Sequence, residues 1–281
     1  MPNLKLSDSE LNNIITDYNN GMSMDQITKK YHHDKNTLKK YFKKHNIDIV
    51  LRNRQEAILC SQKRQKANEE KRKYFVKDDY FSEQNANMAY IMGFIMADGS
   101  ISKKDNRIQI CLSENDADFL KIFYNEIGGS QIVYYKVKDK YPTCRWQCCS
   151  SQIKKDLISY EIIPHKTGFA KIPNNLEKQF YPDFIRGYFD GDGSIYEEKN
   201  GIAGFEIVSH NKEILKQIIA YFEENDIPKV NIKTDKRCNI NYSIKYRKQA
   251  IKKIYKILYY SNNCLYMKRK FDKFQKIALE K

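Results

Sequence analysis

The sequence predicts an α+β protein with two pseudo-symmetric αββαββα repeats, each with an antiparallel sheet, preceded by a small all-α helix-turn-helix domain. One peptide occurs twice, as IMGFIMADGSI at 91–101 and as IRGYFDGDGSI at 185–195. The hydrophobic period changes from 3.6 to 2 after each copy. Two copies at domain-sized spacing imply two copies of one supersecondary unit. We therefore divide the chain into a helix-turn-helix domain (1–50), a basic linker (51–80), a first repeat (81–179) and a second repeat (180–281).

Residues 1–50 predict three short helices arranged as a helix-turn-helix. Ser7 or Asp8 can cap the first helix, the second runs from about Met24 to Tyr31, and Asp34 caps the third. We expect one face of the third helix to bind DNA, although a solvated face on an ordinary three-helix bundle would show the same pattern. This face carries Lys35, Asn36, Lys39, Lys40 and Lys43.

The linker that follows is polar and basic, with few Gly or Pro residues. Such a segment can be a helical or extended tether that follows phosphates, or a disordered spacer. The sequence does not separate these two alternatives.

Each copy of the repeated peptide predicts a buried helix with small residues on one face. Gly93 and Ala97 are four residues apart, as are Gly187 and Gly191, so each pair lies on one side of its helix. Two such faces can approach until their backbones nearly touch. We therefore expect the two helices to pack against each other.

Each predicted helix ends with an acid followed by a glycine, Asp98 with Gly99 in the first copy and Asp192 with Gly193 in the second. The glycine is in its usual position just past the C-terminus of a helix. The two carboxylates would then lie side by side at the negative ends of two helix dipoles, where each disfavours the charge of the other. A divalent cation with oxygen ligands would offset this repulsion. Magnesium or calcium suits a site without His or Cys, and we expect Mg²⁺. The candidate metal ligands are Asp98, Asp192, Ala97 and Gly191.

These two peptides resemble the motif of the LAGLIDADG homing endonucleases in their single-chain, two-repeat form. The nine motif positions fall on 91–99 and 185–193, and the eighth position, which carries the metal-binding acid in the family, is Asp98 and Asp192. Met96 occupies the sixth position of the first copy, where the family consensus has Asp. The resemblance covers roughly residues 86–275 and leaves out the N-terminal module.

The resemblance implies a site-specific double-strand DNA endonuclease, acting as a monomer. In the family, each repeat lays a saddle of antiparallel strands over one half of a long, non-palindromic target. Hydrolysis of the phosphodiester bonds requires a divalent metal and leaves short 3′ overhangs.

Each motif is followed by segments with the pattern of strand, helix, two strands and helix. In the first repeat these are strand 107–112, helix 115–127, strands 131–138 and 141–150, and helix 152–160. In the second repeat they are strand 204–209, helix 211–225, strands 229–234 and 239–247, and helix 249–260.

One face of these strands is rich in amides, hydroxyls and cations and poor in acids, which suits base edges and phosphates in a major groove. An ordinary half-exposed sheet would alternate in the same way. The candidate DNA-binding residues are Arg107, Arg145, Gln147, Asn231, Lys233, Asn241, Ser243 and Lys245.

Three further side chains are candidates for catalysis. Lys166 and Lys268 recur at similar distances after Asp98 and Asp192, and the resemblance implies a basic residue near the scissile phosphate. Either lysine could instead be an ordinary surface charge. Gln109 resembles the polar residue of the first strand that orients the attacking water, and Glu206 is its candidate counterpart in the second repeat.

The composition favours a polyanionic partner. Fifty Lys and Arg against 35 Asp and Glu give a net charge of +15, as expected for binding double-stranded DNA.

The sequence contains neither a signal peptide nor an apolar run of membrane-spanning length. Seven cysteines, an odd number without zinc spacing, indicate reduced thiols, with metal ligation as an alternative. We expect an intracellular, DNA-associated protein that does not bind membranes.

Two rival functions stay open. The same fold could serve a DNA-binding regulator that does not cleave or an RNA splicing maturase; the pair of acids argues against the regulator, whereas maturase activity could coexist with cleavage. A recombinase or transposase using the N-terminal module would need a separate catalytic constellation, and the sequence contains no clear candidate for one.

Overall fold

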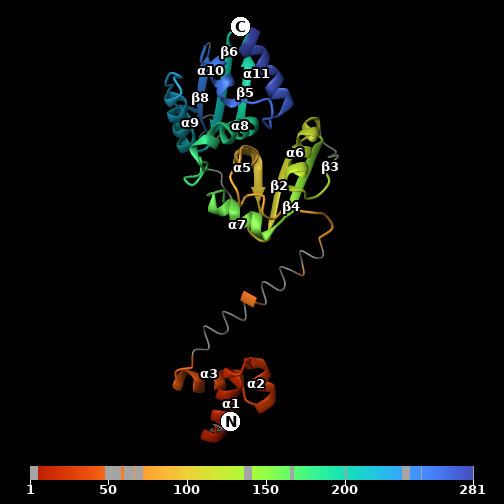
Figure 1. Ribbon diagram of the computed structural model, residues 1–281, viewed down its shortest axis with the longest axis vertical. Coiled ribbons are helices and arrows are strands. Elements are labelled where there is room, and N and C mark those ends of the chain that lie inside the picture. The colour runs from red at the N-terminus through yellow and green to blue at the C-terminus, as the bar shows by residue number, and fades with distance from the viewer. Residues whose placement is uncertain are drawn as a thin grey trace. The chain divides into compact units, whose positions relative to one another are not determined.

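The computed structural model describes residues 6–47, 58–59, 67, 72–135, 141–164, 168–199, 201–235, 241–247 and 249–280. The chain forms two compact units, residues 1–72 and 73–281 (Figure 1). Most of the predicted linker, the ends of two predicted strands (136–138 and 239–240) and Lys166 lie outside the described residues.

The N-terminal unit contains the three predicted helices, α1 (Asp8–Asn19), α2 (Met24–Tyr31) and α3 (Lys35–Lys44). The side chains of Ser7, Ser23 and Asp34 accept hydrogen bonds from the first turns of α1, α2 and α3, respectively, which satisfies backbone donors that have no partner within the helix. The three helices enclose a small apolar core, formed by Leu6, Ile14, Tyr18, Met24, Ile27, Leu38 and Phe42.

The second unit contains two repeats with the same order of elements, which confirms the predicted fold class. The first repeat consists of α5 (Ala86–Asp98), β1 (Gly99–Ile101), β2 (Arg107–Ser113), a short 3₁₀ helix (Glu114–Asp116), α6 (Ala117–Ile127), β3 (Val133–Tyr135), β4 (Thr143–Cys149) and α7 (Ser151–Ser159). After a second 3₁₀ helix (Lys178–Phe180), the second repeat consists of α8 (Tyr181–Asp192), β5 (Gly193–Glu197), β6 (Ala203–Ser209), α9 (Lys212–Glu224), β7 (Lys233–Asp235), β8 (Asn241–Arg247) and α10 (Gln249–Leu258). A further helix, α11 (Lys268–Glu280), follows without a predicted counterpart.

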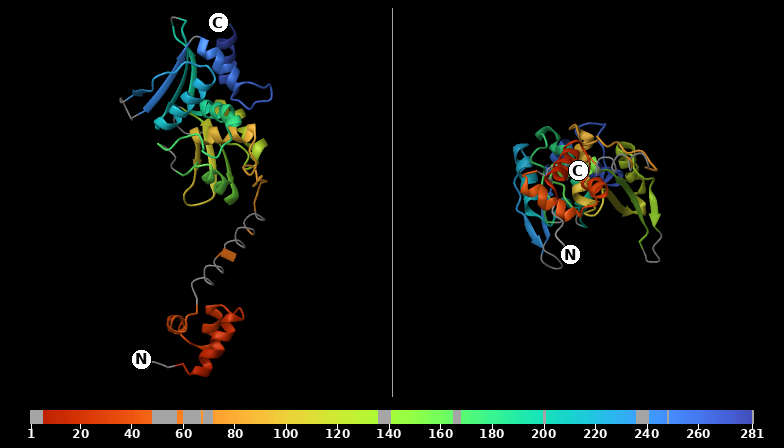
Figure 2. Two further views of the ribbon diagram at one scale, coloured as in Figure 1. Left: turned by 60° about the vertical axis from the view of Figure 1, so that its left-hand side comes forward. Right: turned by 90° about the horizontal axis from the view of Figure 1, so that it is seen from below.

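Each repeat has a four-stranded antiparallel sheet, with the strand orders β1-β2-β4-β3 and β5-β6-β8-β7. The two sheets lie on opposite sides of α5 and α8 (Figures 1 and 2). Because α5 lies in the middle of the unit, every residue from Met88 to Met96 is buried, and the helix is apolar on all sides. No described helix combines the length and the apolar character needed to cross a bilayer.

The register of the two sheets is equivalent residue by residue. Gln109 on β2 pairs with Ser100 and Gln147, and Glu206 on β6 pairs with Ser194 and Lys245. Glu206 therefore occupies the position of Gln109 in the second repeat, as expected from the sequence.

The glycines that follow the two motif acids do not have the backbone conformation most common at a helix C-terminus. Gly99 has φ −72° and Gly193 has φ −97°, both outside the left-handed region. The chain continues from each helix directly into a strand. Glycine is needed for another reason: a Cβ on Gly99 would lie 2.7 Å from the carbonyl oxygen of Ile95, and one on Gly193 would lie 2.6 Å from that of Phe189.

Candidate nucleic-acid interface and metal site

The two motif helices touch through their backbones. A Cβ built on Gly93 would lie 2.0 Å from the carbonyl oxygen of Phe184, and one built on Gly187 would lie 2.0 Å from that of Tyr90. Both separations are far shorter than any real carbon–oxygen contact. Only glycine is therefore compatible with this approach of α5 and α8.

This contact continues to the C-terminal ends of the helices and brings the two motif acids to one place. A Cβ on Gly191 would lie 2.3 Å from the Cβ of Ala97 and 3.5 Å from Oδ2 of Asp98. Asp98 thus lies directly across from Gly191, the residue before Asp192. Both acids are exposed at this edge of the unit, where the helix dipoles add to the negative potential.

The donor chemistry of this edge fits a hard divalent cation. The ligands available are carboxylate and backbone carbonyl oxygens. Among the described residues, no cluster of three or more His, Cys, Asp or Glu side chains forms. Mg²⁺ typically takes one or two protein carboxylates and completes its coordination with water and phosphate, so two acids facing solvent satisfy this requirement.

A buried lysine lies behind the acidic edge. Lys270, on α11, is 7% exposed, and its Nζ donates to the carbonyl oxygens of Phe189 at 2.9 Å, Asp190 at 2.6 Å and Gly193 at 2.7 Å. The carbonyl of Gly191 is 3.3 Å away. Burial lowers the pKa of Lys270 to about 8, while the carboxylates of Asp190, Asp98 and Asp192 favour its charged form.

Lys268, chosen from the sequence as a catalytic candidate, faces solvent. Its side chain is 82% exposed and its Nζ is 2.8 Å from a carboxylate oxygen of Asp272. Helical periodicity could have separated the two lysines, because Lys270, Phe274 and Ile277 share the buried face of α11. Lys166 lies outside the described residues, so its role stays a prediction.

The outer faces of the two sheets carry most of the candidate DNA-binding residues. Strands β2 and β4 alternate between buried side chains such as Ile110 and Trp146 and half-exposed ones. The half-exposed residues on this face of the first sheet are Arg107, Gln109, Arg145 and Gln147. The half-exposed candidates on the corresponding face of the second sheet are Asn241, Ser243 and Lys245.

Two of the predicted basic contacts in the second repeat differ in their surroundings. Lys245 is held 3.6 Å from a carboxylate oxygen of Glu206 and 5.2 Å above the ring of Tyr196, so its charge is partly neutralised. Lys233, on the edge strand β7, is exposed, and Asn231 is exposed just before that strand.

Comparison with known proteins identifies the second unit. The family model described as "LAGLIDADG-like domain" matches residues 85–138 and 180–266, half of the chain. The chain belongs to the LAGLIDADG-like family. This confirms the resemblance predicted from the two motifs. The match begins at residue 85 and so does not include the N-terminal unit.

Two solved structures, one of a meganuclease and one of a homing endonuclease, resemble the chain at low sequence identity. The meganuclease I-SmaMI bound to uncleaveable DNA is 17% identical with a TM-score of 0.48, over 69% of this chain and 88% of that one. The homing endonuclease I-WcaI bound to its DNA recognition sequence is 16% identical with a TM-score of 0.47, over 69% and 90%. No curated protein sequence matches the chain.

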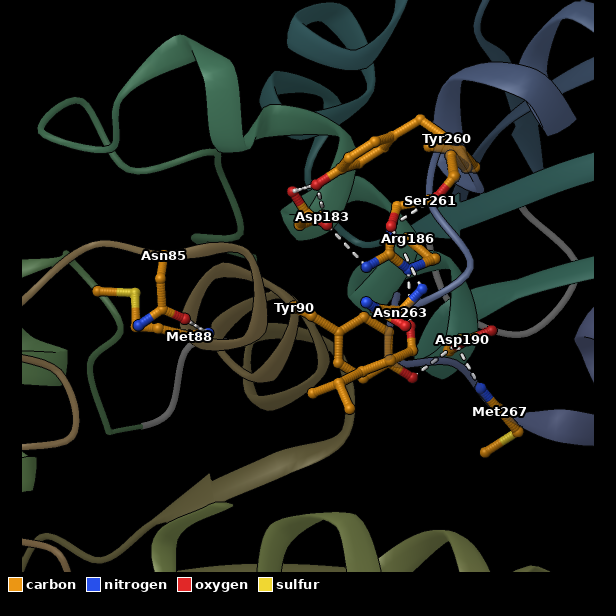
Figure 3. Close-up of polar contacts among 12 residues, drawn as sticks. Asn85, Met88, Tyr90, Asp183, Arg186, Asp190, Tyr260, Ser261, Asn263 and Met267 are labelled. Atoms are coloured by element: carbon orange, nitrogen blue, oxygen red, sulfur yellow. Dashed lines mark hydrogen bonds and ion pairs between the residues drawn. The ribbon is translucent and has the colours of Figure 1, made fainter.

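The sixth position of the second LAGLIDADG motif, Asp190, has a structural role that the sequence did not reveal. Asp190 is fully buried, and its Oδ2 accepts hydrogen bonds from the Tyr90 hydroxyl at 2.6 Å and the Met267 amide at 2.8 Å (Figure 3). Burial raises the pKa of Asp190 to about 6. This carboxylate therefore joins α5, α8 and the segment before α11. The first motif has Met96 at the same position and lacks this connection.

An ion pair buried at the start of the second LAGLIDADG helix extends this network. Arg186 is 2.7 Å from a carboxylate oxygen of Asp183, and both side chains are buried (Figure 3). Its Nε donates to the Leu265 carbonyl at 2.7 Å, and its guanidinium lies 5.2 Å from the ring of Tyr90. The charge is thus both paired and hydrogen-bonded, as buried charges require.

In the N-terminal unit, α3 presents the predicted basic face. Asn36, Lys39, Lys40 and Lys43 are exposed. Lys35 differs, because its Nζ lies 2.6 Å from a carboxylate oxygen of Asp25.

Proposed function

We propose that the protein is a site-specific double-strand DNA endonuclease that hydrolyses phosphodiester bonds in a long, asymmetric target with Mg²⁺. The observation that carries this proposal is the meeting of two glycine-packed helices that bring Asp98 and Asp192 to one exposed edge. An ordinary pair of packed helices does not require two carboxylates at the point where their backbones touch.

In this proposal, Asp98 and Asp192 hold the divalent ion together with the carbonyl groups of Ala97 and Gly191. When bound, the ion supplies Lewis acidity that assists water in attacking phosphorus and offsets charge on the leaving 3′ oxygen. Gln109 orients water from β2. Lys270, rather than the solvent-facing Lys268, is the better placed cation, because its ammonium lies against the carbonyl groups of Gly191 and Gly193, on either side of Asp192.

The outer faces of the two sheets bind the two halves of the target. Their equivalent positions differ in chemistry, with Gln109 and Gln147 in the first repeat and Glu206 and Lys245 in the second. Different side chains recognise different base edges, so the two half-sites differ in sequence. Because both repeats lie in one chain, a monomer suffices. We place the protein inside the cell, associated with DNA.

The test is a cleavage selection on a library of randomised duplexes. We expect Mg²⁺ to give double-strand cuts within a defined sequence, and EDTA to abolish them while leaving binding detectable in a gel-shift assay. Sequence-specific binding without cleavage in Mg²⁺, Mn²⁺ or Ca²⁺ would instead support a non-cleaving regulator or an RNA maturase on the same fold.

We further propose that residues 1–50 form a helix-turn-helix domain that adds contacts outside the footprint of repeats 81–179 and 180–281, joined to them by the basic segment 51–80. Deleting residues 1–50 should weaken and broaden target recognition without removing cleavage. Lys39, Lys40 and Lys43 are exposed, so the truncated protein should lose about three units of slope in log affinity against log salt, near one per phosphate contact.

Fluorescence anisotropy at several salt concentrations, with both proteins on the same duplex, measures this slope. Lys35→Ala is the internal comparison, because its charge is already paired with Asp25. It should change the slope less than Lys39→Ala. Identical slopes for the full-length and truncated proteins would contradict a DNA-binding role for the module.

A further inference from the structure

The outer face of the first sheet carries an arginine stacked on a tyrosine. The guanidinium carbon of Arg145, on β4, lies 4.7 Å from the ring centroid of Tyr135, on β3 (strand positions in Figure 1). In the register, Arg145 pairs with Val133, and Tyr135 pairs with Thr143. The two side chains are therefore diagonal neighbours on one face, and stacking holds the guanidinium plane against the ring.

The stacked guanidinium has donors that remain free for a ligand. Its Nε is buried and out of reach of a ligand. The two terminal amino groups, for which no hydrogen bond is found among the described residues, are therefore the donors that a ligand can meet. The cross-strand neighbours of Arg145 on the same face are Cys111 and Val133, neither of which carries a charge. This differs from Lys245 in the second sheet, which lies beside Glu206. Arg145 thus presents a fixed fork of donors that no neighbouring carboxylate on the sheet neutralises.

We propose that Arg145, positioned by Tyr135, reads a guanine in the half of the target that the first repeat covers. This inference rests on the proposed function, in which this face meets DNA. An arginine fork matches the O6 and N7 acceptors of guanine in the major groove. A base rather than a phosphate is the ligand because β4 is an inner strand, flanked by β2 and β3, and the centre of a sheet in a groove faces base edges.

At the matching register positions the second repeat has a serine and an aspartate in place of the arginine and the tyrosine. The register places Ser243 at the position of Arg145, because Ser243 pairs with Val208 and Lys233 as Arg145 does with Cys111 and Val133. Asp235 takes the place of Tyr135. The guanine reader is therefore confined to one half-site, and it contributes to the asymmetry of the target.

The experiment uses the full-length protein and selects bound duplexes from a randomised library, followed by sequencing. We expect the wild type to select guanine at one position of one half-site. Arg145→Lys keeps the charge but removes the two-pronged set of donors. It should reduce the preference for guanine over the other bases at that position alone by roughly 10- to 100-fold. Tyr135→Leu should lose part of this discrimination, and Tyr135→Phe, which keeps the ring, should retain it.

Tyr124→Leu is the matched control for Tyr135→Leu, because Tyr124 is an exposed tyrosine on α6 rather than on the outer face of the sheet. Thermal denaturation checks that each variant folds. If Arg145→Lys leaves the base preference unchanged while Arg145→Ala weakens binding to all sequences equally, the ligand is a phosphate and the inference is wrong. The proposed endonuclease function would survive that result, whereas a wild type that selects no DNA would overturn both.

Discussion

Gly187→Ala should destabilise the protein by about 3 kcal/mol or more. In an unconstrained helix the same change is favourable by up to about 1 kcal/mol, since alanine has the higher helix propensity. Here the added Cβ would lie 2.0 Å from the Tyr90 carbonyl oxygen and 2.9 Å from the Phe94 amide, and neither backbone atom can move without separating α5 from α8. Gly93→Ala, which meets the Phe184 carbonyl at 2.0 Å, should have a similar effect.

The measurement is equilibrium denaturation, followed by circular dichroism, of the wild type and both variants. Ala220→Gly, at an exposed position of α9, is the control for propensity alone and should cost no more than about 1 kcal/mol. A gain in stability on Gly187→Ala would show that the two helices do not meet.

The swap of Gly191 and Ala97 offers a second control. Gly191→Ala places two Cβ atoms 2.3 Å apart, so this variant should also be destabilised. Adding Ala97→Gly removes the methyl group with which the new one collides, so that the interface again holds a single methyl group. The double variant should regain most of the lost stability. This rescue is expected only if the two residues face each other across the helix pair.

Asp98→Asn or Asp192→Asn should reduce double-strand cleavage by about 100-fold or more while leaving DNA affinity nearly unchanged. Each change removes a proposed metal ligand, and metal assistance is worth several kcal/mol of transition-state stabilisation. It removes no phosphate contact, because a carboxylate repels phosphate. The assay is cleavage of a supercoiled plasmid carrying the selected target, in which nicked and linear products are resolved.

The same assay compares the two lysines of α11. Lys270→Met should slow cleavage, since it removes the buried ammonium at the C-terminus of α8, whereas Lys268→Met removes only an exposed partner of Asp272 and should cut normally. The reverse result would return the catalytic role to Lys268. Full cleavage by the double Asp98→Asn and Asp192→Asn variant would refute the metal assignment.

Local patterns in the sequence determined the elements of this protein and the position of its motifs. The N-terminal helices begin where Ser7 and Asp34 can cap them, because capping depends only on residues two or three positions apart. Alternation along β2 and β4 indicated which side chains are buried, because side chains in a strand point to opposite faces in turn. The repeated motif further predicted that Gly93 and Gly187 lie where two helices touch.

Only the tertiary structure decided which residues far apart in the chain meet. It placed the Lys270 ammonium against the backbone carbonyls at the end of α8, since that contact depends on how α11 packs against α8. It joined Asp190 to Tyr90 through a hydrogen bond across the two repeats, and it stacked Arg145 on Tyr135 through the pairing of two strands. A propensity or period describes near neighbours along the chain, whereas these contacts depend on how whole elements pack and on the register between them.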